Sequence, residues 1–255
     1  MEQMYTTWKE LAVSGGDLTF FQNFFVKFYQ AFIEADRWLQ YLNGVKTTLM
    51  VTAMALVLGI CLGLLVALVR TAHDQQRPGR RNPFLGVVNA LCQVYTTVIR
   101  GTPMMVQLLI WGFVVFKTSR NHTMVGIIGL GINSGAYVSE IVRGGLMSVD
   151  LGQSEAGRSL GLGYLDTMRF IVIPQAFKNI LPALGNELIT LFKDTSLVSA
   201  IGGTELVYFA EAVGAKTYEY MFPYVGIALM YLVIVMILTA LQGKLERRLR
   251  QSDRR

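Results

Sequence analysis

Charged side chains are scarce in this sequence. Asp, Glu, Lys and Arg make up 16% of its 255 residues, whereas apolar residues make up 53%, and the mean hydropathy is +0.43. This balance excludes an ordinary soluble domain of the same length. Residues 47–69 and 220–243 contain no charged side chain, and each stretch exceeds the ~20 residues that a helix needs to cross a bilayer. The sequence therefore predicts an integral membrane protein.

Cysteine and histidine are rare as well, with two residues of each type. Cys61 and Cys92 lie in apolar stretches and have no partner at a metal-binding spacing. His73 and His122 are not part of the His-Glu-x-x-His pattern of zinc enzymes. We therefore expect no metal site, no cofactor and no catalytic residue in this chain.

A phosphate-binding loop is also missing. The one Gly-Lys pair, Gly243-Lys244, is followed by Leu245 and lacks the upstream glycine of the G-x-x-x-x-G-K-[ST] pattern. The chain is predicted not to be an enzyme, and any step driven by ATP must draw on a separate ATPase.

A third apolar segment is broken in its middle. Residues 82–99 and 101–116 carry no charge, but Arg100 separates them and Pro103 follows at once. Proline removes a backbone donor and clashes with the preceding helical turn. We therefore expect one bent span here, which crosses mostly within residues 104–116.

Two more crossings complete the set. Residues 123–139 form an apolar span rich in glycine and isoleucine. Residues 170–192 form a span that contains four residues unsuited to lipid contact: Pro174, Lys178, Pro182 and Glu187. Such a polar span faces protein or a water-filled cavity. We predict an all-α membrane protein with about five transmembrane helices.

Basic residues are unevenly distributed between the connecting segments. Thirteen Lys and Arg side chains lie in one set of segments: 70–83, 143–169 and 244–255. Seven lie in the other, longer set: 1–43, 117–122 and 193–219. The positive-inside rule places the first set in the cytoplasm, so the amino terminus is predicted outside and the carboxy terminus inside.

The net charge of the chain is +6, but its basic side chains are not interleaved with aromatic residues on one face. This distribution argues against nucleic acid as a partner.

This topology divides the chain into an extracytoplasmic segment 1–43, a transmembrane domain 44–243 with a cytoplasmic loop 148–168, and a basic cytoplasmic tail 244–255. Within the first segment, five phenylalanines repeat at helical spacing: Phe21, Phe24, Phe25, Phe28 and Phe32. We expect an amphipathic helix at the outer membrane interface, and a functional lid is the alternative.

Residues 155–174, EAGRSLGLGYLDTMRFIVIP, form a charged loop between two spans. Glu155 and Ala156 can begin a short helix along the membrane surface. Gly161 and Gly163 then allow the backbone to turn sharply, and Pro174 interrupts the helix that follows. An ordinary hairpin loop that happens to contain glycine is the alternative.

The spacing of this loop resembles the EAA loop of ABC importer permeases, which reads E-A-A, three residues, G, nine residues, I, one residue, L-P. Gly157 and Ile173 depart from that pattern, where it has alanine and leucine. Further segments resemble the polar amino acid branch of the family: RGTPMMVQLL at 100–109, GAYVSEIVRGG at 135–145, GQSEAG at 152–157, IPQAFKNILPALGNELI at 173–189 and KDTSL at 193–197.

The resemblance implies the type I ABC importer permease fold in a bacterial cytoplasmic (inner) membrane. It implies a second permease subunit, identical or paralogous, an ATP-binding ABC ATPase dimer beneath the pair, and an extracytoplasmic binding protein that delivers an amino acid substrate. The loop would couple the permease to the ATPase through four residues: Glu155, Ala156, Gly157 and Gly161.

The polar span places five side chains on one helical face, and these are Asn186, Glu187, Thr190, Lys193 and Asp194. An isolated charge facing lipid at mid-membrane costs about 2.5–3.5 kcal/mol, so this face is predicted to line the substrate path. Glu187 or Asp194 can bind the ammonium of an amino acid, and Lys193 its carboxylate. An internal ion pair that only joins helices is the alternative. The resemblance also links the positions of Glu187 and Asp194 to substrate contact.

An ion-coupled secondary amino acid transporter is the remaining alternative, because broken helices and polar mid-span residues occur in such carriers too. Carriers of this kind need two related halves, and five crossings do not divide in that way. The sequence favours the permease subunit of an ATP-driven importer and does not identify the amino acid.

Overall fold

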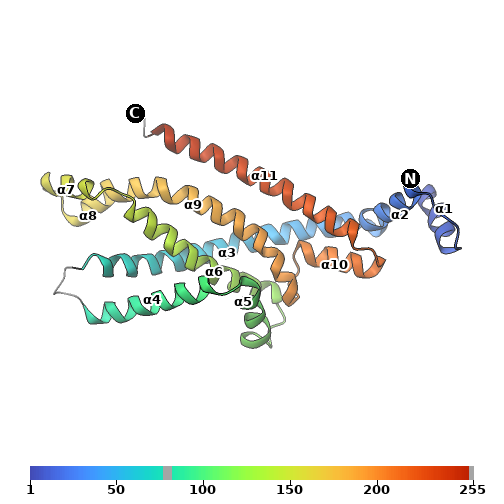
Figure 1. Cartoon of the computed structure of the whole chain (residues 1–255), viewed down its shortest axis with the longest axis horizontal. Coiled ribbons are helices and arrows are strands. Elements are labelled where there is room, and N and C mark those ends of the chain that lie inside the picture. Colours follow the sequence, from blue (N-terminus) through green and yellow to red (C-terminus); the bar gives the residue numbers. More distant parts are fainter. Residues whose placement is uncertain (77–81, 253–255) are drawn as a thin grey trace.

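The computed structural model describes residues 1–76 and 82–252, and in these ranges every regular element is a helix (Figure 1). The prediction of an all-α protein is confirmed for this part of the chain. Five arginines from two of the three basic segments lie outside the described residues: Arg77, Arg80, Arg81, Arg254 and Arg255.

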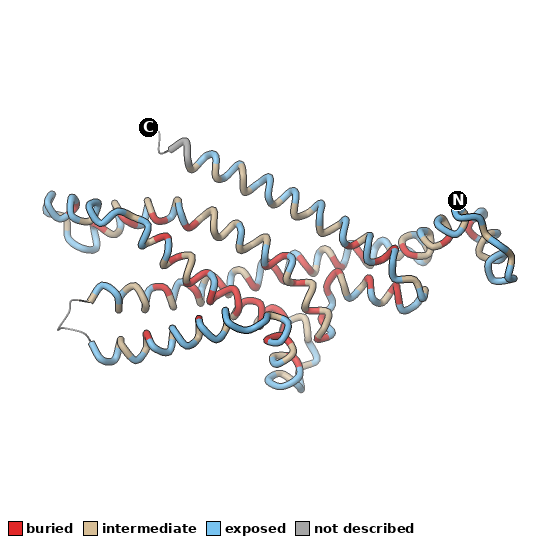
Figure 2. The backbone as a smooth tube through the Cα atoms, viewed as in Figure 1, coloured by how far each residue is buried: buried red, intermediate tan, exposed pale blue. Residues whose placement is uncertain are grey.

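Three helices among the described residues are long and apolar enough to cross a membrane: α3 Arg37–Asp74, α6 His122–Met147 and α11 Met221–Ser252. α6 is the most deeply buried of the three, whereas α11 is exposed along most of its length (Figure 2). The exposed side chains of α11 include Leu229, Leu232, Val233, Met236 and Ile237. An apolar exposed face of this kind suits contact with lipid.

α3 and α6 approach closely because glycine lies at their contact. A Cβ atom on Gly59 would lie 2.8 Å from the Ser134 Oγ atom, and one on Gly63 would lie 2.6 Å from Val138 Cγ1. Small residues at a helix crossing allow the backbones to approach in this way. Gly59 and Gly63 are therefore packing residues of this crossing.

The third span predicted from the sequence is a bent helix pair. α4 Pro83–Gly101 is followed by α5 Met104–Ile110 and a π-helical turn, Trp111–Val115, at an angle of 109°. The bend lies at Thr102 and Pro103, which both have extended backbone angles, as expected for a residue before proline and a helix start.

The two arms of this broken helix differ in length, and the longer one is not within residues 104–116, where the crossing was expected. α4 has 19 residues and is packed along α3 and α6, and at 1.5 Å per residue it extends about 28 Å. The arm Met104–Val115 is far shorter and turns away from α4. The longer arm therefore precedes the proline, because nothing in residues 83–101 interrupts the helix.

The polar span is the second bent pair, in which Tyr164–Ile201 meets α10 Leu206–Thr217 at 46°. Its first part contains, in order, α8 Tyr164–Thr167, a π-helical turn Met168–Val172, α9 Ile173–Asp194 and a 3-10 turn Thr195–Ile201. Pro174 lies in the first turn of α9, and the expected interruption is the π turn just before it. Counting each bent pair as one span gives up to five crossings.

The amino-terminal segment folds as a helical hairpin of α1 Glu2–Val13 and α2 Phe20–Phe32. A capping box between Thr19 and Gln22 starts α2. Glu34 joins the hairpin to α3 through salt bridges with Lys9 at 2.6 Å and Arg37 at 2.9 Å. The predicted helix of phenylalanines is present, and its exposed side chains include Phe20, Phe21, Phe24 and Phe28.

The helices sort the loops to two opposite ends (Figure 1). One end holds the end of α3, the start of α4, the carboxy-terminal end of α11 and α7 Leu151–Ser159 with α8. The other end holds α1, α2 and α10. The described parts of the three basic segments thus lie at the same end of the molecule.

Candidate functional site

The loop predicted to couple the chain to a partner begins with a helix. Asp150 caps α7 by accepting a hydrogen bond from the Gly152 N–H at 2.6 Å. Glu155 and Ala156 lie on this helix with exposed side chains. The expected short helix is present, but it begins at Leu151 and not at Glu155, because Asp150 supplies the cap.

Gly157 is the buried residue of α7. A Cβ atom at this position would lie 3.0 Å from Thr167 Oγ1 and 3.0 Å from Ile171 Cδ1. An alanine here would require these neighbours to move by a few tenths of an ångström. The departure from the E-A-A pattern therefore lets α7 pack closely on the helix that leads into α9.

Gly161 ends the α7 turn in the left-handed conformation, with φ +80°. Its N–H donates to the Arg158 carbonyl at 2.9 Å, and the Leu162 N–H donates to the Gly157 carbonyl at 3.1 Å. A Cβ atom on Gly161 would meet no atom within 4 Å. The position therefore requires glycine for its backbone angle rather than for space.

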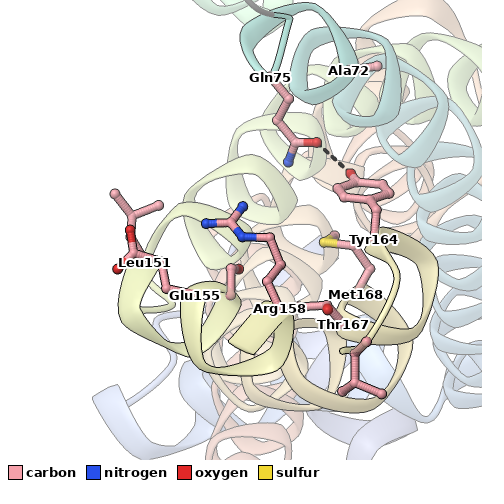
Figure 3. A pocket seen from close by; sticks show the side chains of 10 residues that line it. Ala72, Gln75, Leu151, Glu155, Arg158, Tyr164, Thr167 and Met168 are labelled. Atoms are coloured by element: carbon pink, nitrogen blue, oxygen red, sulfur yellow. Dashed lines mark hydrogen bonds between the residues drawn. The ribbon is translucent and has the colours of Figure 1, made fainter. Parts of the chain in front are cut away.

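A cavity of about 780 Å³ lies between this loop and the end of α3. Figure 3 shows Glu155 and Arg158 on α7 facing it, with Tyr164 on the opposite wall. The Tyr164 hydroxyl donates a hydrogen bond to Gln75 Oε1, which ties α8 to α3. The cavity therefore has both charged and aromatic lining residues, and the helices that form it lie at the end of the molecule that holds the basic segments.

Three large apolar side chains of this loop are exposed. Leu151 is 81% exposed, Leu160 80% and Leu165 77%. Exposed apolar residues gathered beside charged ones are typical of a protein interaction surface. The loop has the composition of a docking site.

The five polar residues of α9 lie on one side of the helix, but they have different neighbours. Ser134 Oγ on α6 donates to Glu187 Oε1 at 2.7 Å. Gln242 Nε2 on α11 donates to Asn186 Oδ1 at 2.9 Å and to the Pro182 carbonyl at 3.2 Å. Asn186 therefore joins α9 to α11, while Glu187 joins it to α6.

The remaining three side chains are less constrained. Thr190 and Lys193 are exposed and Asp194 is half-buried. Among residues 1–76 and 82–252, no salt bridge joins Lys193 or Asp194 to another side chain.

An ion cluster between α3, α4 and α6 was not predicted from the sequence. Glu140 contacts Arg70 directly and lies 3.9 Å from the Nη1 atoms of Arg100 and Arg143. Arg143 also forms a 3.1 Å salt bridge with Asp74. The cluster gives Arg100 a place beside α6, for which its position in the sequence offered no signal.

The comparisons with known proteins agree with this geometry. Residues 82–251, more than half of the chain, match the family described as the inner membrane component of binding-protein-dependent transport systems. This chain belongs to that family. Membership identifies a multi-pass membrane component of a transport system, and it decides against the ion-coupled carrier that the sequence had left as an alternative.

Two relatives illustrate the similarity. The arginine transport system permease protein ArtQ of Bacillus subtilis is 36% identical over 215 residues, which cover 83% of this chain and 93% of the relative. The glutamine transport system permease protein GlnP of Escherichia coli K12 is 34% identical over 213 residues, which cover 82% and 92%. This transport component therefore aligns with nearly the full length of both.

Solved structures share its fold. A crystal structure of an amino acid ABC transporter with histidines matches with a TM-score of 0.73 and 39% identity, covering 82% of this chain and 94% of that one. The MetNI methionine ABC transporter in an inward-facing conformation matches with a TM-score of 0.70 and 19% identity, covering 85% and 99%. The second match supports the ABC permease fold alone.

Proposed function

We propose that this chain is the permease subunit of an ATP-driven importer of a polar or charged amino acid in a bacterial inner membrane. The relatives are named for arginine and glutamine transport. The observation that carries the proposal is the separation of two sites: a polar face with half-buried carboxylates in α9, and an exposed docking loop at one end.

The amino terminus lies outside and the carboxy terminus in the cytoplasm in this proposal. The loop of α7 and α8 then faces an ABC ATPase dimer, and Glu155, Ala156, Gly157 and Gly161 form the coupling element. The exposed leucines and the charged cavity beside α7 support this assignment. Since the chain has no phosphate-binding loop, ATP is hydrolysed by the partner and the movement reaches the spans through this element.

The polar face of α9 binds the substrate. Glu187 or Asp194 accepts the ammonium group and Lys193 binds the carboxylate, while Asn186 and Thr190 complete the face. The half-buried Glu187 already accepts a hydrogen bond from Ser134, which holds one of its carboxylate oxygens in place. The other oxygen is then available for a donor from the substrate.

The subunit works in an assembly. A second permease copy or a paralogue completes the path, and an extracytoplasmic binding protein delivers the amino acid. The α1–α2 hairpin lies at the outer membrane interface, with the exposed phenylalanines of α2 in contact with lipid.

The substrate site is tested by Glu187→Gln in the complex reconstituted into liposomes. The change keeps the size of the side chain and removes its charge, so the KM for the transported amino acid is expected to rise about tenfold or more, which corresponds to the loss of a charge-assisted hydrogen bond. The matched control is Glu211→Gln, because Glu211 is an exposed carboxylate of α10. Unchanged uptake by Glu187→Gln with every amino acid tested would contradict the site.

A further inference from the structure

A buried polar pair lies beside the bend between α4 and α5. Gln107 of α5 is 6% exposed and Asn133 of α6 is 8% exposed. The Asn133 Nδ2 atom donates to Gln107 Oε1 at 3.0 Å. Burying two amide side chains in the middle of a membrane helix bundle requires that their polar atoms find partners.

Gln107 supplies the donor that the bend lacks. In a continuous helix the Ile99 carbonyl would accept from the N–H of residue 103, but Pro103 has none. Gln107 Nε2 donates to this carbonyl at 2.7 Å and also to the Thr102 carbonyl at 3.1 Å. One side chain therefore satisfies two backbone groups freed by the break and holds the angle between α4 and α5.

The same pair leads directly to the carboxylate of α9. Asn133 is followed by Ser134, whose hydroxyl donates to Glu187 Oε1 at 2.7 Å. Ser134 is fully buried, and its side chain lies against Gly59 of α3, where a Cβ atom would come within 2.8 Å. Ser134 therefore has no room to move toward α3, and its position follows that of the α6 backbone.

We propose that Gln107, Asn133 and Ser134 form one positioning unit, which holds the Glu187 carboxylate in a position that depends on the angle between α4 and α5. The unit makes amino acid binding at Glu187 and the bend angle interdependent. The inference rests on the proposed function, since it takes Glu187 as a substrate ligand. None of the three residues needs to touch the substrate.

The first test is Asn133→Ala in the reconstituted complex with its ATPase and binding protein. The change breaks the link between the bend and α6, while Gln107 keeps its bonds to the two freed carbonyls. We expect the KM for substrate-stimulated ATP hydrolysis to rise about 5- to 10-fold with the basal and maximal rates unchanged. Asn89→Ala is the matched control, because Asn89 is a buried asparagine of α4 with no side-chain hydrogen bond among the described residues. It is expected to leave the KM unchanged.

The second test separates positioning from a merely structural role. In a Glu187→Gln background, Asn133→Ala should raise the KM no further, since both changes act on the same carboxylate. Ser134→Ala is the milder variant if Asn133→Ala fails to assemble, and it should show the same KM increase and the same lack of additivity.

The outcomes distinguish this inference from the proposed function. Two outcomes would contradict the positioning unit and leave the substrate site standing. In the first, Glu187→Gln changes the KM but neither Asn133→Ala nor Ser134→Ala does. In the second, the effects of Asn133→Ala and Ser134→Ala add to that of Glu187→Gln. If Glu187→Gln itself has no effect, the substrate site is wrong and the positioning unit fails with it.

Discussion

Replacing Gly161 tests the coupling loop at a single backbone angle. Its φ of +80° is one that L-residues with a side chain rarely adopt. Because a Cβ atom there would meet nothing within 4 Å, Gly161→Ala introduces conformational strain and no clash. Holding an L-residue in the left-handed region costs about 1–2 kcal/mol.

That cost sets the size of the effect. A free energy of 1–2 kcal/mol changes an equilibrium about 5- to 30-fold, so the population of the docking geometry falls by this factor relative to a loop relaxed to negative φ. Gly161→Asn should lose less, since asparagine tolerates the left-handed region. Gly161→Pro should lose most, because proline fixes φ near −65°.

The assay is the ratio of amino acid imported to ATP hydrolysed by the complex in liposomes. We expect membrane insertion to be normal for all three variants and the ratio to fall in the order Asn, Ala, Pro. Gly163→Ala is the control, since Gly163 has φ −66° and its added Cβ would lie 3.7 Å from the nearest atom, an ordinary contact. Normal coupling in Gly161→Pro, or an equal loss in Gly163→Ala, would refute the reasoning.

Two further predictions concern packing and membrane placement. Gly59→Ala should lower the melting temperature of the purified complex, because overpacking against Ser134 costs about 1–3 kcal/mol and exceeds the helix propensity gain of about 1 kcal/mol. The control Gly86→Ala should not lower it, since an added Cβ atom there meets no atom within 4 Å. Equal shifts in the two variants would contradict the close packing of α3 on α6 at Gly59. A spin label at Phe21→Cys in a cysteine-free background should be more accessible to oxygen in lipid than to an aqueous nickel reagent. A label at Asn23→Cys, on the opposite side of α2, should show the reverse. Equal accessibility of the two labels to both reagents would place the hairpin away from the membrane interface.

Local sequence signals predicted most of the helices. The uncharged runs identified α3 and α11, and the glycine of the loop was expected where Gly161 adopts a positive φ. These signals are local. An uncharged run of sufficient length predicts a membrane-spanning helix, and a glycine in a loop indicates where the backbone can adopt a positive φ.

The neighbours of each helical face could not be predicted in the same way. Asn186 and Glu187 were correctly placed on one side of a helix, but their partners Gln242 and Ser134 lie 56 and 53 residues away in the chain. Periodicity tells which residues share a face and not which helix covers it. The bent span shows the same limit, since the position of Pro103 predicted the break but not the lengths of the two arms.

The most direct measurement is ATP hydrolysis by the complex of this chain with its ATPase in liposomes, in the presence of the loaded binding protein and a panel of amino acids. The proposed function predicts that polar or charged amino acids stimulate hydrolysis, that uptake stops without ATP, and that the chain alone transports nothing under an ion gradient. Uptake by the chain alone, driven by an ion gradient and independent of ATP, would contradict it.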